Sequence, residues 1–392
     1  MLNNNSSFND SLPERLYYDV TMTNISSTNT VPPIAYFQEE RASNFLFSPQ
    51  DYYMSVQRFT IDTQLLPIFI PLIQPTQANP NLTIYSLTMT FLYNGVNYQQ
   101  QQFINWISQD ISAPIPLGPS LNNNKQEIIS DYYFCYSHQY LIELMNTCAS
   151  VCYTNLQAQV VAAGGVLPSN YAPVFNFDTT NNICIINADN LGYANSLNNP
   201  IKLYMNGPLY QLFSSFQAQI NGYTNITNGK NYQIVIDNFD GSSITPFPAF
   251  NPIFDAINVY QEYSTVSNWC PIASLVFISY VLPIVNEQIS SPLIFNSGQT
   301  TFLNSGNNNA VASIITDFVA GDNKYKPFLT YTPSSEYRRI QLTGNSPLRK
   351  IDVAVFFRTR LGDLVPMRIS SGGTVTIKFL FERKDTLFYK SK

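Results

Sequence analysis

The chain contains few charged residues. Asp, Glu, Lys and Arg make up only 11% of its 392 residues, whereas 14% are aromatic. The polar part of the surface must therefore come largely from Asn, Gln, Ser and Thr. An enzyme that moves freely in solution normally covers itself with Lys and Glu. A weakly charged surface instead favours a protein whose faces are mostly covered by neighbouring molecules.

Residues for nucleophilic or metal chemistry are also scarce. His138 is the only histidine, and no nucleophile-elbow sequence occurs, so a Ser/His/Asp or Cys/His arrangement is not expected. Cys148 and Cys152 lie four residues apart, but a zinc site usually needs four closely paired ligands. We interpret both as small apolar packing residues. The sequence thus predicts no catalytic residue, no metal site and no cofactor.

Acidic residues of the middle region offer two weaker candidate sites. Asp237–Gly241 is rich in carboxylates but lacks the spacing and closing Glu of an EF-hand, so an Asx-type turn is favoured over calcium binding. A glycosidase needs two carboxylates across a sugar. Nothing in the spacing of Asp178, Asp189 and Asp255 selects such a pair.

Long hydrophobic runs are absent. A transmembrane helix needs roughly 20 apolar residues, and the most apolar run, Ile272–Val285, is shorter and contains polar residues and a proline. We therefore expect no transmembrane segment. The first ten residues are polar and Asn-rich, unlike a signal peptide. Five scattered cysteines do not make a disulfide framework, so reduced thiols in a protein made in the cytosol are expected.

The small net charge of −5 hides an asymmetry along the chain. Residues 324–392 contain 14 Lys and Arg against 5 Asp and Glu, whereas residues 1–323 contain 6 against 20. The basic end suits an acidic neighbour, anionic lipid or nucleic acid, or else represents ordinary solvated strands. Its basic residues are not interleaved with aromatic ones, which argues against a sequence-specific nucleic-acid groove.

Alternating apolar residues predict β-strands at both ends of the chain. Ile351, Val353, Val355 and Phe357 alternate with mixed residues, and Val375–Phe381 repeats the pattern. In the first half, Leu82–Tyr93 and Val96–Gln102 flank Asn94-Gly95, which fits a type I′ hairpin turn. The one convincing helical pattern is Tyr133–Ala163, followed by a glycine pair that can end it.

These patterns predict a mainly β chain in which two distant stretches form one sandwich. We expect residues 1–14 to form a flexible arm and residues 386–392 to form a tail. The sandwich is expected from residues 15–106 together with 256–385. Residues 107–255 change character, with a proline-rich loop, the helix and short strands, and are expected to form an inserted α+β domain.

Hydrophobic patterns recur in several stretches toward both ends of the chain, which together cover about a sixth of it: Tyr53–Ile73, Trp269–Val285, Glu336–Thr343, Ile351–Phe357, Leu364–Arg368, Gly372-Gly373 and Val375–Phe381. These patterns resemble those of penton, or vertex capsid, proteins of virophages and polinton-like viruses. The stretches contain no reactive motif, so the resemblance concerns packing rather than chemistry. The resemblance does not include residues 107–255.

The resemblance implies a single jelly-roll domain that stands on a capsid shell, with the inserted domain projecting outward. It also implies a homopentamer at the fivefold vertex of the virion, in contact with the major capsid protein and a possible minor capsid protein. Such a protein would be made in the host cytoplasm. Charge asymmetry adds a predicted basic assembly face at Arg338, Arg339, Arg349 and Lys350.

Two other functions remain open at this point. A small double jelly-roll major capsid protein, which forms trimers, predicts a second complete set of strands inside residues 107–255. A vertex protein whose insertion binds or cleaves host glycans would use the aromatic and Asn-rich surface of that region for attachment.

Overall fold

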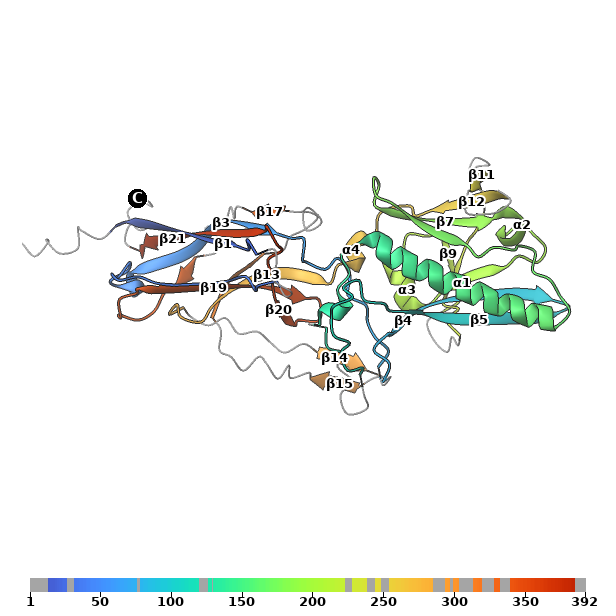
Figure 1. Cartoon of the computed structure of the whole chain (residues 1–392), viewed down its shortest axis with the longest axis horizontal. Helices are drawn as coiled ribbons and strands as arrows, with labels where there is room; N and C mark the ends of the chain where they lie inside the picture. Colours follow the sequence, from blue (N-terminus) through green and yellow to red (C-terminus); the bar gives the residue numbers. More distant parts are fainter. Residues whose placement is uncertain are drawn as a thin grey trace, which may run out of the picture. The chain divides into compact units, whose positions relative to one another are not determined.

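The chain folds into two compact units. Unit 1 is Met1–Leu66 together with Ile272–Lys392, and unit 2 is Pro67–Pro271. The computed structural model describes residues 13–26, 32–75, 78–119, 126–128, 130–222, 228–237, 244–247, 254–284, 293–296, 299–302, 313–318, 328–331 and 339–384. In these residues the protein is mainly β, with several antiparallel sheets and one long helix (Figure 1).

Unit 1 contains two larger antiparallel sheets and a separate hairpin. The first sheet has the order β1 (Arg15–Thr23), β21 (Thr374–Arg383), β3 (Tyr52–Asp62), β17 (Phe328–Tyr331), with β18 (Ile340–Gln341) also on β3. The second has the order β16 (Ser313–Phe318), β13 (Ile272–Ser279), β19 (Lys350–Thr359), β2 (Tyr36–Glu40), with β20 (Leu364–Pro366) on β19. The hairpin is β14 (Leu293–Asn296) with β15 (Gln299–Phe302), and a 3-10 turn, η1 (Pro49–Asp51), precedes β3.

The strands of unit 1 pair concentrically along the chain. Eight strands form four nested pairs. The outermost pair is β1 with β21, and the next is β2 with β19. Inside these lie β3 with β17 and then β13 with β16. The register of the outermost pair runs from Arg15 opposite Glu382 to Thr23 opposite Thr374. Unit 1 therefore needs both ends of the chain.

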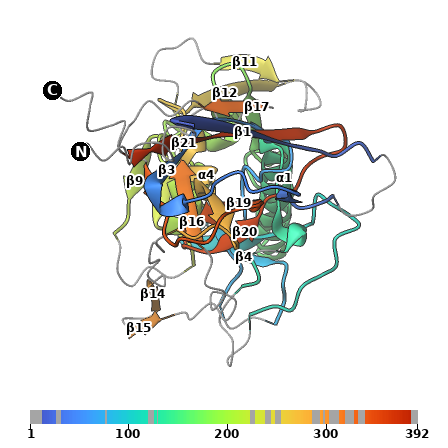
Figure 2. The ribbon, with the colours of Figure 1, turned by 90° about the vertical axis from the view of Figure 1, so that its left-hand side faces the viewer.

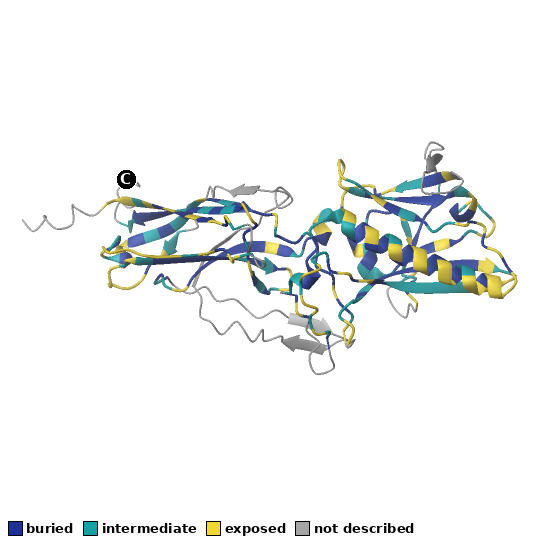
Figure 3. Cartoon of the chain, in the orientation of Figure 1, coloured by how far each residue is buried: buried dark blue, intermediate teal, exposed yellow. Residues whose placement is uncertain are grey.

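The core of unit 1 lies between its two sheets. Side chains alternate across a strand, and the alternate positions Val20 on β1 and Ile377 on β21 are each only 1% exposed. Phe59 on β3 meets Phe277 on β13 with ring centroids 5.2 Å apart, which joins the first sheet to the second. Figure 2 shows β1 and β21 in one layer and β19 and β20 in another. Figure 3 shows the buried residues along the strands of unit 1.

Unit 2 contains two sheets and a 25-residue helix, α1 (His138–Ala162). One sheet has the order β5 (Val96–Asn105), β4 (Leu82–Tyr93), β8 (Lys202–Met205), β10 (Tyr232–Ile234), β9 (Ala218–Ile220). The other has the order β11 (Ile244–Phe247), β12 (Phe254–Tyr260), β7 (Ile183–Asp189), β6 (Val174–Asp178). Short elements complete the unit: η2 (Asp131–Tyr133), α2 (Asn190–Tyr193), α3 (Gly207–Leu212) and α4 (Val266–Trp269).

Helix α1 packs on β4, β5 and β6. Its buried residues recur at three- and four-residue spacings, so one face is covered while the opposite face is exposed (Figure 3). The predicted helix began at Tyr133, but the first residues of that stretch form η2 and an extended segment. None of the helices in the described residues combines the length and apolar character needed to cross a membrane.

Neutral amide side chains complete the backbone hydrogen bonding of unit 2. Asn206 donates from Nδ2 to the Ile84 carbonyl at 2.7 Å, while its Oδ1 accepts from the amides of Ser86 and Leu209. Gln126, Asn146 and Gln261 also donate and accept at once, each holding two segments together. An amide can do this because it contains one carbonyl oxygen and two N–H donors.

The unit boundaries differ from the predicted domain boundaries of 107 and 255. Residues 67–106 and 256–271 belong to unit 2, because β4 pairs with β8 and β12 pairs with β7. The predicted hairpin does form, with positive φ at Asn94 and Gly95. Its alternation could not indicate which sheet the hairpin joins, since local sequence specifies a strand but not its distant partner.

Candidate assembly surfaces

The described members of the predicted basic face lie at the end of unit 1 where β1 begins and β21 finishes. Arg339 directly precedes β18, whose Gln341 is opposite Tyr53 at the start of β3. Arg349 and Lys350 lie at the start of β19, where Lys350 is opposite Glu40 at the end of β2. Arg338 lies outside the described residues. We call this region the terminal end of unit 1.

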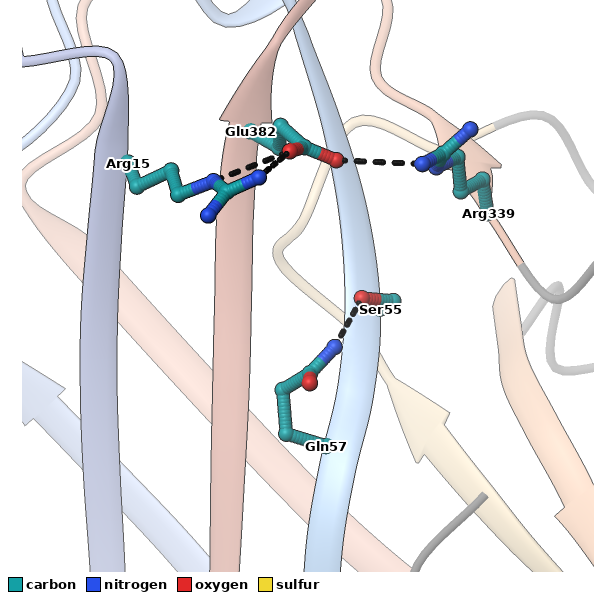
Figure 4. A network of polar contacts seen from close by, with 5 residues as sticks. All are labelled: Arg15, Ser55, Gln57, Arg339 and Glu382. Atoms are coloured by element: carbon teal, nitrogen blue, oxygen red, sulfur yellow. Dashed lines mark hydrogen bonds and ion pairs between the residues drawn. The ribbon is translucent and has the colours of Figure 1, made fainter. Parts of the chain in front are cut away.

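A buried carboxylate joins two of the arginines at the terminal end. Glu382 is 6% exposed, and its Oε1 accepts from Nε and Nη2 of Arg15 at 3.0 and 2.8 Å. Its Oε2 lies 3.3 Å from Nη2 of Arg339 (Figure 4). Hydrogen bonding to Glu382 is the main cause that raises the pKa of Arg15. Arg339 is therefore part of a structural network, because a buried carboxylate is costly without partners.

Arg349 lies in a more exposed setting than Arg339. Nε of Arg349 is 3.1 Å from Oε1 of Glu40, and both side chains are more than half exposed. Beside them, Arg41 lies over the ring of Tyr18, whose hydroxyl donates to Glu39. Burial, and next the bond to Glu39, raise the pKa of Tyr18 to about 12. Arg339 and Arg349 are thus both paired with acidic residues. The net positive charge of this region is therefore smaller than its number of Lys and Arg residues suggests.

Sequence reasoning did not identify Arg15 and Glu382 as partners. They are 367 residues apart, and nothing local to either residue indicates the other. The one available signal is position, because each is a charged residue at the end of an apolar strand pattern. Charged residues also lie in the middle of the outer face of the first sheet, where Lys378 is 3.4 Å from Asp19 and 5.2 Å from the ring centre of Tyr17.

Asp352 has a structural role that its place in the alternation does not indicate. It is fully buried on β19 and accepts from the Ser279 hydroxyl at 2.5 Å. It also accepts from the amides of Tyr280 and Val281 at 2.9 and 3.1 Å. These bonds fix the turn that follows β13. The position of the exposed Tyr280 side chain is therefore set by a rigid backbone.

His138 and the cysteines occupy packed surroundings in unit 2. The His138 ring stacks on Phe177 with centroids 4.8 Å apart, and burial lowers its pKa to about 4. Cys148 and Cys152 are buried, and each thiol donates to a carbonyl of β5. Burial raises the pKa of Cys152 to about 12, and that of Cys148 also rises. Such thiols are poor nucleophiles because the thiolate is disfavoured.

The acidic candidates are separated into local turns. Asp178 accepts from Asn181 and Thr180, which lowers its pKa. Asp189 is buried, accepts from Ser169 at 2.6 Å and caps α2, whereas Asp255 is exposed on β12. Most of the Asp237–Gly241 turn lies outside the described residues. Within the described residues, no three His, Cys, Asp or Glu side chains come together as metal ligands.

Comparisons with known proteins give one consistent family. The model of the family described as Sputnik minor capsid protein V18/19 matches residues 16–383. The uncharacterized protein V18 of Sputnik virophage is 31% identical over 155 residues, which are 38% of this chain and 89% of V18. The structural protein V19 of the same virophage is 27% identical over 203 residues, which are 50% of this chain and 88% of V19.

Solved structures give the same result over the whole fold. A chain in the cryo-EM structure of the Sputnik virophage has a TM-score of 0.80 and 25% identity, covering 96% of this chain and 99% of its own length. The mavirus penton protein has a TM-score of 0.62 and 13% identity, covering 95% and 100%. The predicted resemblance to virophage capsid proteins is confirmed. This chain belongs to the Sputnik minor capsid protein V18/19 family, and it is a structural component of a virophage capsid rather than an enzyme.

Proposed function

We propose that this chain is a penton protein, five copies of which close into a ring at the fivefold vertices of a virophage capsid. The observation that supports this most strongly is the fold similarity to the mavirus penton protein, which extends over 95% of the chain and so includes residues of both units. The identity to that protein is only 13%, so the similarity concerns the fold, and the pentamer is our proposal for this chain.

The strand order of unit 1 supports a single jelly roll. The eight concentrically paired strands make up the main path of two sheets, four in each, and this is the arrangement expected when one long antiparallel hairpin is rolled up. In a closed ring each copy must present two different, matching faces, because the contacts are head to tail. Viral capsid jelly rolls fit this role, and their packing in a ring covers sheet edges that would otherwise recruit other strands.

Unit 2 differs from what a double jelly roll requires. Its sheet orders are β5-β4-β8-β10-β9 and β11-β12-β7-β6, and α1 packs on strands of both sheets. This arrangement favours the penton over the trimeric major capsid protein. Glycan binding by unit 2 remains a prediction, to be tested by applying the whole chain to a glycan array. Uniformly blank spots would count against it.

The terminal end of unit 1 is the surface we assign to the surrounding shell. The chain leaves unit 1 after β3 and returns at β13, and both positions lie at the opposite end of the sheets from Arg15 and Glu382. This connectivity supports an outer role for unit 2. The exposed Arg349 and the half-buried Lys350 are then available to acidic groups of the major capsid protein, with Arg338 and Arg339 as further members of the face.

The mass of the purified chain tests the ring. Native mass spectrometry is expected to give five times the 44.3 kDa of one chain, and image reconstruction is expected to place it at fivefold positions. A stable monomer that is absent from particles would end the proposal.

Charge reversal tests the assignment of the shell-facing surface. Arg349→Glu with Lys350→Glu is expected to reduce particle yield while thermal stability changes little, because exposed ion pairs contribute little to folding. Arg339→Glu is the contrasting variant and is expected to destabilise unit 1, since it leaves Glu382 with a like charge. Normal particle yield from the double variant would contradict the shell-facing role.

A further inference from the structure

The outer face of the second sheet of unit 1 contains an apolar hollow of about 160 Å³. We call it the tyrosine hollow. Tyr36 and Tyr280 meet edge to face at its rim with ring centroids 6.4 Å apart, and they are 38% and 52% exposed. The hydrogen bonds of Asp352 hold the backbone of Tyr280, so the hollow is already shaped. Its residues include Ile34, Tyr36, Tyr280, Ala354, Phe356 and Pro366.

Unit 2 contains a segment that exposes apolar side chains to an unusual degree. We call residues 107–119 the strap. Ile111 is 97% exposed, Ile115 69% and Leu117 89%, although residues of this kind are normally buried. Exposed apolar side chains that gather on a surface mark interaction sites in soluble proteins. The strap therefore has the composition of a contact surface rather than of a solvent-exposed loop.

The strap is held in place near both of its ends. Near its start, the Tyr140 hydroxyl donates to the Ile107 carbonyl at 2.8 Å, and Gln109 accepts from the Tyr136 amide. At its other end Pro119 is buried. Pro114 and Pro116 fix φ on either side of Ile115, and residues 114–119 belong to no helix or strand. A segment that is already ordered loses little conformational entropy on binding.

We propose that the strap of one copy binds in the tyrosine hollow of the next copy around the ring. Proline-rich segments bind surfaces lined by aromatic side chains, and Tyr36, Tyr280 and Phe356 line the hollow. Its volume suits one side chain of the size of Ile115 or Leu117, because an apolar cavity of about 150 Å³ holds a benzene molecule. This inference rests on the proposed ring, and it names the two surfaces that meet there.

The charges around the two surfaces are complementary. Arg358 lies on β19 opposite Leu364, two residues from Phe356 and Pro366 of the hollow, and Arg368 forms a bridge with Ile34. In the described residues, Nε of Arg358 is buried without a hydrogen-bond acceptor. The only charged residue of the strap is Asp110, and unit 2 as a whole contains 3 Lys and Arg against 10 Asp and Glu. Two arginines on strands and segments next to the hollow thus favour an acidic segment from unit 2 of another copy.

A second copy is the occupant that the symmetry argument selects. The two surfaces differ from each other, so their contact is heterologous, and repetition closes a ring or makes an open filament. Within one chain the strap remains exposed at Ile111, Ile115 and Leu117. These side chains are therefore available to a neighbouring molecule.

Cross-linking between copies tests the contact directly. All five native cysteines are buried, so an introduced surface thiol reacts selectively with a short bismaleimide. A mixture of the single variants Ile115→Cys and Tyr280→Cys is expected to give a two-chain product, while each variant alone gives none. The double variant in one chain is expected to give a ladder of up to five chains. The matched control replaces Tyr280→Cys with Tyr17→Cys, on the outer face of the first sheet, and is expected to give no product.

Substitutions in the strap provide an independent measurement. Ile115→Ser with Leu117→Ser is expected to weaken ring formation by about tenfold or more, as for removal of buried anchors at an interface. The chain is expected to remain folded because both residues are exposed. Ile220→Ser, at another exposed residue of unit 2, is the control and is expected to leave the ring intact.

The outcomes separate this inference from the proposed function. A wild-type pentamer that gives no cross-link and tolerates the strap variant would overturn the strap contact and leave the penton proposal standing. Strap variants that form pentamers but fail to enter particles would assign the strap to another capsid protein, which also overturns the inference. A wild-type chain that is monomeric in solution and in particles would overturn both.

Discussion

The two units hold their polar groups in different ways. Unit 1 contains 17 Lys and Arg and 15 Asp and Glu, whereas the longer unit 2 contains 3 and 10. The ion pairs described above, such as Arg15–Glu382 and Arg349–Glu40, all lie in unit 1. In unit 2, neutral amide side chains connect separate segments instead, and that of Asn206 binds three backbone groups.

The two units thus use two kinds of polar contact, ion pairs in unit 1 and neutral amide hydrogen bonds in unit 2. An ion pair must offset the cost of removing charges from water, and its strength changes with salt and pH. An amide has no charge to desolvate, and its hydrogen bonds are insensitive to both conditions. The scarcity of charged residues is therefore greater in unit 2 than in unit 1. The following experiments test how far the two units behave separately.

The largest expected effect is the loss of a core aromatic ring from one unit. Phe277→Ala removes the ring that packs on Phe59, and it should lower the stability of unit 1 by about 3–5 kcal/mol. Calorimetry should show a lower transition for unit 1 and an unchanged one for unit 2. Leu156→Ala, buried on α1, is the matched variant and should do the reverse. Equal shifts of both transitions would show that the units unfold together.

Removal of an amide in unit 2 should have the next largest effect. Asn206→Ala leaves the Ile84 carbonyl and the Ser86 and Leu209 amides without this partner, and it also removes the cap of α3. We expect a loss of about 2–3 kcal/mol in denaturant unfolding, because unsatisfied buried groups and lost caps each cost about 1–2 kcal/mol. The loss should be the same at low and high salt.

The control for that variant is Asn221→Ala. Asn221 is exposed, and its side chain binds only the Lys230 carbonyl. Its replacement should change stability by less than about 0.5 kcal/mol. A salt-dependent effect of Asn206→Ala would contradict the neutral role of the amide.

A smaller effect is expected for the carboxylate of unit 1. Glu382→Gln weakens the contacts to Arg15 and Arg339 and should cost about 1–2 kcal/mol, since both arginines are partly exposed. The cost should shrink as salt is raised from low to molar concentrations. Glu40→Gln, which loses an exposed pair with Arg349, is the control and should cost less than about 0.5 kcal/mol. Equal costs at all salt concentrations would remove the contrast between the units.

The smallest predicted effect is the acid response of unit 2. The folded-state pKa of His138 is about 4, below its ordinary value of 6.5, so the unfolded chain binds this proton more tightly. The contribution of neutral His138 to the stability of the folded chain is therefore complete above about pH 6.5, and it is lost as the pH falls toward 4. We expect about 1 kcal/mol, less than the full shift implies because the ring is partly exposed.

His138→Phe is the matched variant for this response. It keeps the aromatic stack on Phe177 but cannot bind a proton. Because the chain contains no other histidine, the transition temperature of this variant should be nearly constant between pH 6.5 and 5. A variant that still loses stability there would assign the response to carboxylates.

Local patterns predicted the elements of the fold better than their partners. The alternation in Val375–Phe381 predicted a half-buried strand, and Asn94-Gly95 predicted a hairpin, because both depend on neighbouring residues. Which sheet the hairpin joins depends on Leu87 meeting Met205 in β8, more than a hundred residues away. No periodicity indicates such a pairing, and for that reason the predicted boundary at residue 107 differs from the start of unit 2 at Pro67.

For the candidate assembly surface, too, the sequence indicated local features but not distant partners. Arg349 and Lys350 could be expected near the surface because they lie where a polar stretch meets an apolar strand. Arg339 could not be assigned to a structural pair, since its partner Glu382 becomes a neighbour only through the pairing of β18 and β21 with β3. The tyrosine hollow was likewise beyond sequence reasoning, because its residues come from four separate strands and turns.

The concentric pairing of unit 1 also orders events during synthesis. Arg15 emerges from the ribosome first, but its partner Glu382 follows 367 residues later, a wait of roughly 20–70 s at usual translation rates. Unit 2 is complete once Pro271 has emerged. Unit 2 can therefore fold while β1, β2 and β3 still lack their partners, and unit 1 is complete only after β21 has been made.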